Sequence, residues 1–343
     1  MKKIKIAMLG FGGIARAHYA AYLQLLDKNA PISVVAVLDC NPSQFDRLLR
    51  INIEGKQVKL DPSIHTYTDV DTLLANEEFD MADVCLPSYL HKEYTVKMLR
   101  AGKHVLCEKP MALSSAECEE MIAASRESGK RLMVAQCLRF APEYLYLKHC
   151  VEDGRFGKPK SLFMNRLCAL PIWGHENWFQ KTEKSGGCIL DMHIHDVDMA
   201  RAMFGEPQAV STVSYGCDMD WQMENTRLFF KDLTAVINGS WDESRTTSFV
   251  ESFRAGFERA TLVKSEGGVL KVYPAEGEPF VPELEDADMY AEEIAYFVDT
   301  ILNDLPNTVN PPESAAQSVK VIEALRESAA SGGEKIAYTP YEF

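Results

Sequence analysis

Short apolar segments alternate with helical patterns over the first 137 residues of the chain. Three of these segments are almost continuous in apolar residues, which is typical of parallel strands that are covered on both faces. The predicted strands are Ile4–Leu9, Ile32–Leu38, Ala82–Leu86, His104–Cys107 and Arg131–Cys137. The predicted helices between them are Ile14–Leu26, Val70–Ala75, His91–Arg100 and Ser115–Ser128. This alternation predicts a doubly wound α/β domain with a parallel sheet over residues 1–137.

A different pattern begins after residue 137. The next predicted elements are a helix from Pro142 to about Glu152, a strand over Lys160–Cys168, and one continuous helix from about Gly187 to Phe204. Alternating apolar and polar residues then predict antiparallel strands. These strands are Ala209–Val213, Arg227–Phe230, Ala235–Trp241, Phe249–Arg254, Ala260–Val263 and Val269–Tyr273. Helices at about Met289–Asn303 and Pro312–Ala330 close the chain, so residues 138–343 are predicted to form a second, α+β domain.

Charge and hydropathy exclude several classes of function. The chain has 343 residues and a formal net charge of −14, which argues against general binding to nucleic acid or anionic membranes. No run of about 18 apolar residues is present, so no membrane-spanning helix is expected. The apolar N-terminal segment is short and enters a glycine turn, which favours a first strand over a signal peptide. We therefore expect a small-molecule ligand, with no nucleic-acid or membrane partner.

The cysteines indicate a reducing environment. There are nine, an odd number, and none forms a Cys-x-x-Cys pair. Cys85, Cys107, Cys137 and Cys168 lie inside apolar runs. This usage predicts reduced, buried thiols in a cytoplasmic protein.

A glycine-rich loop follows the first predicted strand and leads into the first predicted helix. Its residues are Gly10, Phe11, Gly12, Gly13, Ile14 and Ala15. Glycines allow the tight turn and the close approach of a pyrophosphate, and the helix N-terminus favours its negative charge. The second predicted strand ends at Asp39, which is placed to bind a ribose 2′-hydroxyl and to repel a 2′-phosphate. The loop predicts a dinucleotide site that prefers NAD to NADP; the alternatives are a glycine turn without a ligand and a capping role for Asp39.

A carboxylate and an imidazole follow the glycine pair Gly186-Gly187. Asp191 and His195 are four residues apart, which places them on one face if this segment is a continuous helix. Such a pair can work as an acid/base unit. His193 would point away from His195, so it is expected to be structural, and a metal site built from these three residues is disfavoured. The alternative for His195 is a hydrogen-bonded histidine inside a helix, and the alternative for Asp191 is a helix cap or a carboxylate at the edge of the core.

Four motifs in this order resemble the glucose–fructose oxidoreductase / inositol dehydrogenase / MocA family. They are Gly-Phe-Gly-Gly-Ile-Ala at 10–15, Leu-Pro-Ser-Tyr-Leu-His at 86–91, Glu-Lys-Pro at 108–110 and Gly-Gly-x-x-x-Asp-x-x-x-His at 186–195. The pattern covers nearly the whole chain. Two positions depart from it, because Ser185 stands where a third glycine is often found and His193 where a small residue is often found. These departures bear on the substrate rather than on the chemistry.

The resemblance implies a Rossmann domain followed by a domain built on an open, mostly antiparallel sheet. In such proteins this sheet often forms the interface of a dimer or tetramer, so we expect a homodimer or a homotetramer. The last helix, about 312–330, is expected to pack back on the first domain. The resemblance also implies that Lys109 is catalytic and that Asp191 and His195 face the substrate hydroxyl.

These residues suit hydride transfer, in which the oxygen on the reacting carbon must lose or gain a proton. His195 can take that proton because imidazole titrates near neutral pH. Lys109 could orient the hydroxyl or polarise the carbonyl, and Asp191 would orient His195 or bind a second hydroxyl. The sequence leaves open whether Lys109 or His195 moves the proton.

Further residues are predicted to line this site, which should lie between the domains at the carboxyl ends of the parallel strands. On the cofactor side they are Leu86, Pro87, His91 and Glu108, together with Lys109. On the substrate side they are Arg139, Asn165 and Trp178. The alternatives are a salt bridge for Arg139 and a core or surface position for the other two.

The predicted function is hydride transfer between NAD and a secondary alcohol or ketone of a cyclitol, sugar or sugar derivative. A non-catalytic sensor of a dinucleotide or sugar on the same fold is an alternative. A second alternative is a sugar–sugar oxidoreductase that keeps its cofactor through turnover.

Overall fold

The computed structural model describes residues 3–46, 58–216 and 219–342, which belong to two compact units. The first unit comprises Met1–Ala112, Ala116–Cys137 and Ala287–Ala315. The second comprises Leu113–Ser115, Leu138–Asp286 and Ala316–Phe343. The chain therefore leaves the first unit, builds most of the second, returns to the first over Ala287–Ala315 and ends in the second.

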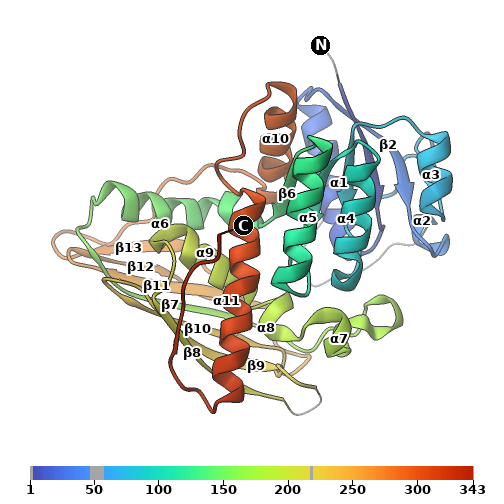
Figure 1. Cartoon of the computed structure of the whole chain (residues 1–343). Helices are drawn as coiled ribbons and strands as arrows, with labels where there is room; N and C mark the ends of the chain where they lie inside the picture. The colour runs from blue at the N-terminus through green and yellow to red at the C-terminus, as the bar shows by residue number, and fades with distance from the viewer. Residues whose placement is uncertain (1–2, 47–57, 217–218, 343) are drawn as a thin grey trace. The chain divides into compact units, whose positions relative to one another are not determined.

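In the part of the chain that the structure describes, the first unit is built on a six-stranded parallel sheet with the strand order β3-β2-β1-β4-β5-β6. Figure 1 labels β2 and β6 of this sheet. The strands are β1 (Ile4–Leu9), β2 (Ile32–Leu38), β3 (His65–Tyr67), β4 (Met81–Val84), β5 (His104–Glu108) and β6 (Leu132–Ala135). The helices are α1 (Gly13–Asp27), α2 (Ser43–Asp46), α3 (Val70–Asn76), α4 (His91–Arg100) and α5 (Ser115–Ser128). The predicted doubly wound α/β class is confirmed. Because β1 lies between β2 and β4, the strand order reverses there, and ligands of such sheets bind at the carboxyl ends of those strands.

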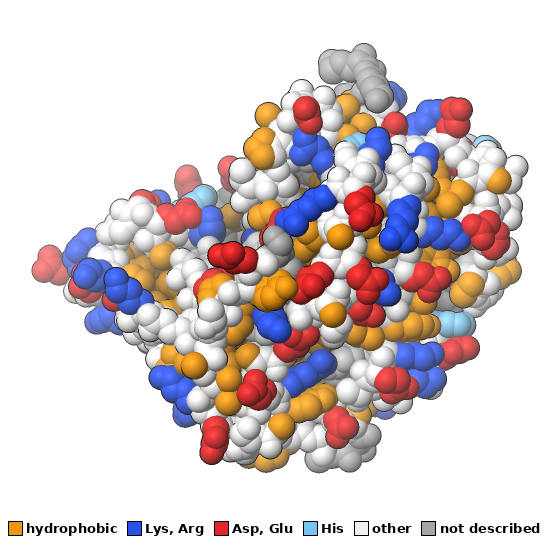
Figure 2. All heavy atoms as spheres, viewed as in Figure 1, with side chains coloured by type: hydrophobic (Ala, Val, Ile, Leu, Met, Phe, Trp, Pro, Cys, Tyr) orange, Lys and Arg blue, Asp and Glu red, His pale blue; other side chains and the backbone are white. Residues whose placement is uncertain are grey.

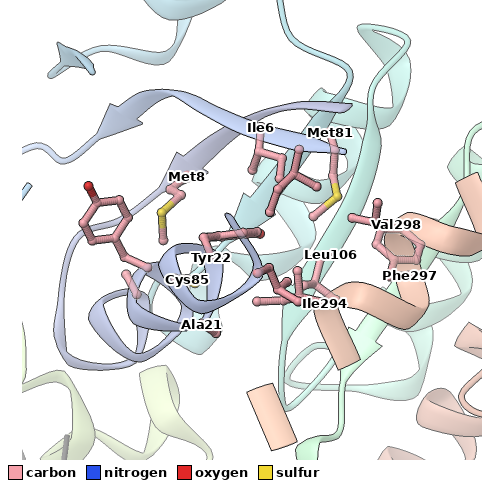
Figure 3. Close-up of a cluster of buried hydrophobic side chains, with 14 of the residues drawn as sticks. Ile6, Met8, Ala21, Tyr22, Met81, Cys85, Leu106, Ile294, Phe297 and Val298 are labelled. Carbon is pink, nitrogen blue, oxygen red and sulfur yellow. The ribbon is translucent and has the colours of Figure 1, made fainter. Parts of the chain in front are cut away.

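Helix α10 (Met289–Leu302) completes the apolar core of the first unit. Figure 3 shows Ile6 of β1 and Tyr22 of α1 in one buried cluster with Ile294 and Phe297 of α10. Burying each such side chain contributes about 1.5–3 kcal/mol. The parallel sheet is therefore covered on this face by two helices that lie more than 260 residues apart in the chain.

The second unit is built on an eight-stranded sheet with the order β13-β12-β11-β7-β10-β9-β8-β14. The strands are β7 (Pro159–Leu167), β8 (Ala209–Tyr215), β9 (Met223–Phe229), β10 (Thr234–Ser240), β11 (Val250–Phe257), β12 (Ala260–Lys264), β13 (Leu270–Pro274) and β14 (Ile336–Ala337). β7 and β10 pair in parallel, and the other pairs are antiparallel. The expected open, mostly antiparallel sheet is confirmed.

One face of the second sheet is covered by helices and the other is open. The remaining helices are α6 (Pro142–Asp153), α7 (Thr182–Ser185), α8 (Cys188–Asp191), α9 (Ile194–Phe204) and α11 (Pro312–Ala330). Helices α6 and α9 lie along the covered face (Figure 1). On β7 the side chains of Leu162 and Met164 are buried, whereas Phe163 between them is 46% exposed. This alternation is expected for a strand with one face on the core.

Two properties of the described residues bear on partners. No helix among them is both long and apolar enough to cross a membrane. Acidic and basic side chains are interspersed over the face shown in Figure 2, so the excess of negative charge is not gathered into one patch on that face.

Candidate functional site

The glycine-rich loop lies at the carboxyl end of β1, where the backbone makes a turn that only glycine fits. Gly10 has a φ of 93°, and a Cβ there would lie 2.4 Å from the carbonyl oxygen of Cys85. Helix α1 begins at Gly13, and its N-cap, Gly12, provides no side-chain hydrogen bond to the first amides. These amides and the open space beside Gly12 suit a phosphate group. The loop therefore fits the pyrophosphate of a dinucleotide.

Asp39 joins this loop to the end of β2. Its Oδ2 accepts a hydrogen bond from the amide of Phe11 at 2.9 Å, and its Oδ1 accepts one from the amide of Asn41 at 2.8 Å. The Phe11 side chain is fully buried and stacks edge-on against Tyr19, so it supports the loop from inside. The structure thus brings Asp39 and the glycine loop together, and the half-buried carboxylate keeps lone pairs for a ribose hydroxyl.

Lys109 lies in the same unit, directly after β5. Leu86 and Pro87 follow β4, which pairs in parallel with both β1 and β5, so all three strand ends meet at one edge of the sheet. Leu86, Pro87 and Lys109 are half-buried and remain accessible to a ligand. The other two candidates of this group, Glu108 and His91, direct their side chains into the protein instead. The sequence alone did not distinguish the three accessible residues from the two whose side chains point into the protein.

A buried charged cluster under Lys109 was not predicted. His18, Asp83, Glu108 and Glu293 come from α1, β4, β5 and α10, and each is at most 4% exposed. Burial alone would lower the pKa of His18, but the Asp83 carboxylate raises it well above its ordinary value. Burial raises the pKa of the Glu293 carboxyl well above its ordinary value. Charged residues inside otherwise apolar strands, such as Asp83 and Glu108, were the signal that could have revealed this cluster.

The predicted continuous helix through Asp191 and His195 is wrong. Helix α8 ends at Asp191 and α9 begins at Ile194, and in the break the amide of His193 donates to the carbonyl of Cys188, five residues back. The buried His193 ring explains the break, because its Nε2 contacts Thr226 Oγ1 at 2.8 Å and its atoms pack against Gly239 of β10. Asp191 is therefore the last residue of one helix, and His195 belongs to the first turn of the next.

The other substrate-side candidates are engaged within the protein. Arg139 forms a bidentate pair with the buried Asp198, with both nitrogen–oxygen distances at 2.8 Å. Asn165 lies on the open face of the sheet, where it accepts a hydrogen bond from Asn238 and donates one to Ser252. Trp178 stacks on Phe179 with the ring centroids 3.9 Å apart. The salt bridge of Arg139 is the alternative that the sequence left open, and substrate binding by these three residues stays a prediction.

A pocket of about 400 Å³ lies within the second unit, beside the glycine pair. It is lined by Leu113, Thr182, Glu183, Gly186, Trp221 and Arg326. Arg326 of α11 donates a hydrogen bond to the carbonyl of Gly186 at 2.6 Å. A Cβ at Gly187, whose φ is 77°, would lie 2.8 Å from the Cβ of Trp221. The glycine pair is thus required by close packing, and no pattern in the sequence linked it to Trp221 or Arg326.

Glu224 of β9 gives this unit a pH-dependent stability. Its side chain is buried, its Oε2 has no hydrogen-bond partner among the described residues, and burial raises its pKa to about 8. The folded state therefore keeps a proton that the unfolded state releases above pH 4.5, so stability falls as pH rises from 4.5 to about 8. The slope is about 1.4 kcal/mol per pH unit.

We expect Glu224→Gln to remove this slope and to raise the free energy of unfolding most at pH 8. Urea unfolding at pH 5 and pH 8 measures the difference. Glu243→Gln, which changes a partly exposed carboxylate in the same unit, serves as the control. Parallel pH profiles for Glu224→Gln and the wild type would contradict the expectation.

Two sequence models of one family match the chain. The model described as "Oxidoreductase family, NAD-binding Rossmann fold" matches residues 4–136. The model described as "GFO/IDH/MocA C-terminal domain" matches residues 144–251. Together the two models cover more than half of the chain and both of its structural units.

Two similar proteins are a reductase and a dehydrogenase by name. A 1,5-anhydro-D-fructose reductase from Ensifer adhaerens is 29% identical over 242 residues, which are 67% of this chain and 72% of that protein. The scyllo-inositol 2-dehydrogenase (NADP(+)) IolU from Bacillus subtilis is 33% identical over 172 residues, which are 49% of this chain and 52% of that protein. The alignment thus spans only about half of the second relative.

A solved structure of levoglucosan dehydrogenase in complex with NADH and L-sorbose shares the fold, with a TM-score of 0.84 and 18% identity. The match covers 99% of this chain and all of that one. The family models, the relatives and the two-unit architecture agree, and the chain belongs to the GFO/IDH/MocA family of oxidoreductases with an NAD-binding Rossmann fold.

Proposed function

We propose that the protein transfers a hydride between NAD and a secondary alcohol or ketone of a cyclitol, sugar or sugar derivative. One observation carries the proposal: the ends of β1, β2 and β5 bring the glycine loop, Asp39 and Lys109 to one edge of the parallel sheet. Ligands of doubly wound folds bind at this edge. The named activities of the relatives, on an anhydrosugar and on an inositol, support the class of substrate.

The proposed roles are divided between the two units. The nicotinamide ring, when bound, accepts or donates the hydride at the substrate carbon. Lys109 orients the substrate hydroxyl and stabilises charge on its oxygen. His195 takes the hydroxyl proton, and Asp191 orients His195 or binds a neighbouring hydroxyl. Each role follows from the chemistry of the side chain and from the family to which the chain belongs.

We propose NAD rather than NADP as the cofactor. The Asp39 carboxylate at the end of β2 would accept hydrogen bonds from a ribose 2′-hydroxyl and repel a 2′-phosphate. The residues that follow, Cys40, Asn41 and Pro42, offer no cation for that phosphate. The Bacillus subtilis relative is named as NADP-dependent, so membership of the family does not choose between the two cofactors.

We further propose that the open sheet face mediates a homodimer or homotetramer. Large apolar side chains on the sheet are exposed, namely Phe163, Val213, Tyr215 and Tyr273. Beside them Asn225, Asn238 and Asn165 form a hydrogen-bonded row across three strands. An exposed patch of this kind marks an interaction surface. Seven of the eight described cysteines are buried, which supports the proposal of a reducing, cytoplasmic location.

A spectrophotometric screen tests the proposed reaction. The purified full chain is mixed with NAD or NADP and a panel of cyclitols and sugars, and reduced nicotinamide is followed by absorbance. We expect turnover with NAD and at least one polyol. The variant Asp39→Ser should use NADP better relative to NAD, because the repelling carboxylate is gone.

Two outcomes would contradict the proposal. Cofactor binding seen by fluorescence, with no turnover on any polyol, would favour the sensor. Nucleotide released only when the purified protein is denatured would favour a sugar–sugar oxidoreductase that retains its cofactor. A wild-type preference for NADP would overturn the cofactor assignment alone.

A further inference from the structure

Lys109 lies between two residues, Glu108 and Pro110, that are each held by a different buried histidine. We propose that His18 and His91 are positioning residues, which fix the backbone on both sides of Lys109. The inference rests on the proposed catalytic role of Lys109. All of these residues belong to the first unit.

The first contact fixes the residue before Lys109. His18 Nε2 lies 2.9 Å from Oε1 of Glu108, and Oε2 of the same carboxylate accepts a hydrogen bond from the amide of Lys109 at 3.0 Å. The Glu108 side chain therefore joins the imidazole to the backbone of Lys109. The parallel pairing of β5 with β6 ends at Glu108 and Ala135, so this contact holds the chain where the strand ladder stops.

His18 is itself held in one orientation. Its Nδ1 lies 3.0 Å from Oδ2 of Asp83, and the same Asp83 oxygen accepts a hydrogen bond from the Tyr22 hydroxyl at 2.9 Å. Glu293 Oε1 lies 4.0 Å from His18 Nε2, and both Glu293 oxygens have no hydrogen-bond partner among the described residues. A protonated His18 can donate to Asp83 and Glu108 at once, which fixes the imidazole plane and, through it, the Glu108 carboxylate.

The second contact fixes the residue after Lys109. His91, which is 1% exposed, places Nδ1 at 2.7 Å from the carbonyl oxygen of Pro110 and Nε2 at 2.8 Å from that of Leu86. The ring therefore lies between the segment after β5 and the segment after β4, and the neutral imidazole donates to one of these two carbonyls. Because β4 also pairs with β1, His91 ties the position of Lys109 to the strand that carries the glycine loop.

The contacts of His18 and His91 are important because Lys109 must reach the reacting oxygen of the substrate. Lys109 is the first residue beyond β5, and its side chain is long and flexible. Fixing residues 108 and 110 leaves only the side-chain torsions of Lys109 free to vary. A displacement of about 1 Å in a positioned group can cost about 10²-fold in rate.

A double-mutant cycle with full-length protein tests the proposal. We expect His91→Leu to lower kcat by about 10²-fold and to leave KM for NAD and for the polyol within a few-fold. His91→Gln, whose amide can still donate to one carbonyl, should recover part of the loss. In a Lys109→Met background, His91→Leu should cause little further loss, because it acts through Lys109.

A second readout does not depend on turnover. Acetic anhydride labels lysine amines, and mass spectrometry gives the labelling rate of Lys109 in the protein without substrate. His91→Leu and His18→Gln should each change this rate several-fold. His104→Gln, at the opposite end of β5, is the matched control and should change neither the rate nor kcat.

The outcomes distinguish the catalytic role of Lys109 from its positioning by His18 and His91. Wild-type turnover in Lys109→Met would show that Lys109 is not catalytic. The labelling rates of Lys109 would still test whether His18 and His91 position it. Unchanged labelling of Lys109 in folded His91→Leu protein, or equal losses of kcat with and without Lys109, would overturn the positioning. If His18→Gln does not fold, the His91 variants alone decide.

Discussion

Asparagine in place of His195 should lower kcat by about 10²–10⁴-fold and leave KM for the polyol nearly unchanged. Asparagine retains much of the size and a hydrogen-bond donor, but it cannot take a proton at neutral pH. Binding therefore survives and proton transfer does not. Steady-state kinetics with NAD and the polyol found in the screen measure both constants.

The matched control is His149→Asn, which alters an exposed histidine on α6 of the same unit. We expect wild-type kinetics from that variant. A kcat of wild-type size in His195→Asn would remove His195 from the reaction and leave Lys109 as the group that moves the proton.

Replacing Arg166 with methionine is expected to have the largest effect on stability, about 3–5 kcal/mol at pH 7. Arg166 of β7 is buried and contacts both oxygens of Asp196 at 3.0 Å, with further bonds to Glu251 and Tyr144. Methionine fills similar space but leaves the Asp196 carboxylate buried without its cation. Urea unfolding, followed by a probe in the second unit, measures the loss.

Acid titration gives an independent check of this prediction. Burial would raise the pKa of Glu251, but Arg166 and Lys264 lower it to about 2. The group therefore contributes stability above pH 4.5 that is lost as pH falls toward 2, and Arg166→Met should lose part of this dependence.

The control variant is Arg155→Met, which breaks a solvent-exposed pair with Asp153 and should cost less than about 1 kcal/mol. Equal losses from the two variants would contradict the assignment.

Regular elements with a strong apolar period were predictable from the sequence. The ranges His91–Arg100 and Ser115–Ser128 are helices in the structure, and β1 and β2 span the predicted residues. The short strand β3 was missed because its three residues, His-Thr-Tyr, form no apolar run. The break between α8 and α9 was missed because it depends on the contact of His193 with Thr226, which is distant in the chain.

The parts of the candidate site whose residues lie close together in the sequence were predictable. The glycine loop and the place of Asp39 after the second strand follow from the order strand, turn, helix, strand. The roles of Glu108 and His91 were not predictable, because their partners come from other segments. The carboxylates of Asp83 and Glu108 are paired in the structure because α1 places His18 between them, and the sequence does not show this contact.

The place of α10 in the first unit has a consequence for biosynthesis. Residues 1–137 alone contain every strand of the parallel sheet but lack Ile294, Phe297 and Val298, which cover the apolar face beside α1. A ribosome must therefore make most of the second unit, Leu138–Asp286, before the nucleotide-binding unit can bury that face. Until then, the apolar surface beside α1 stays exposed in the nascent first unit. It is buried only after α10 has left the ribosome.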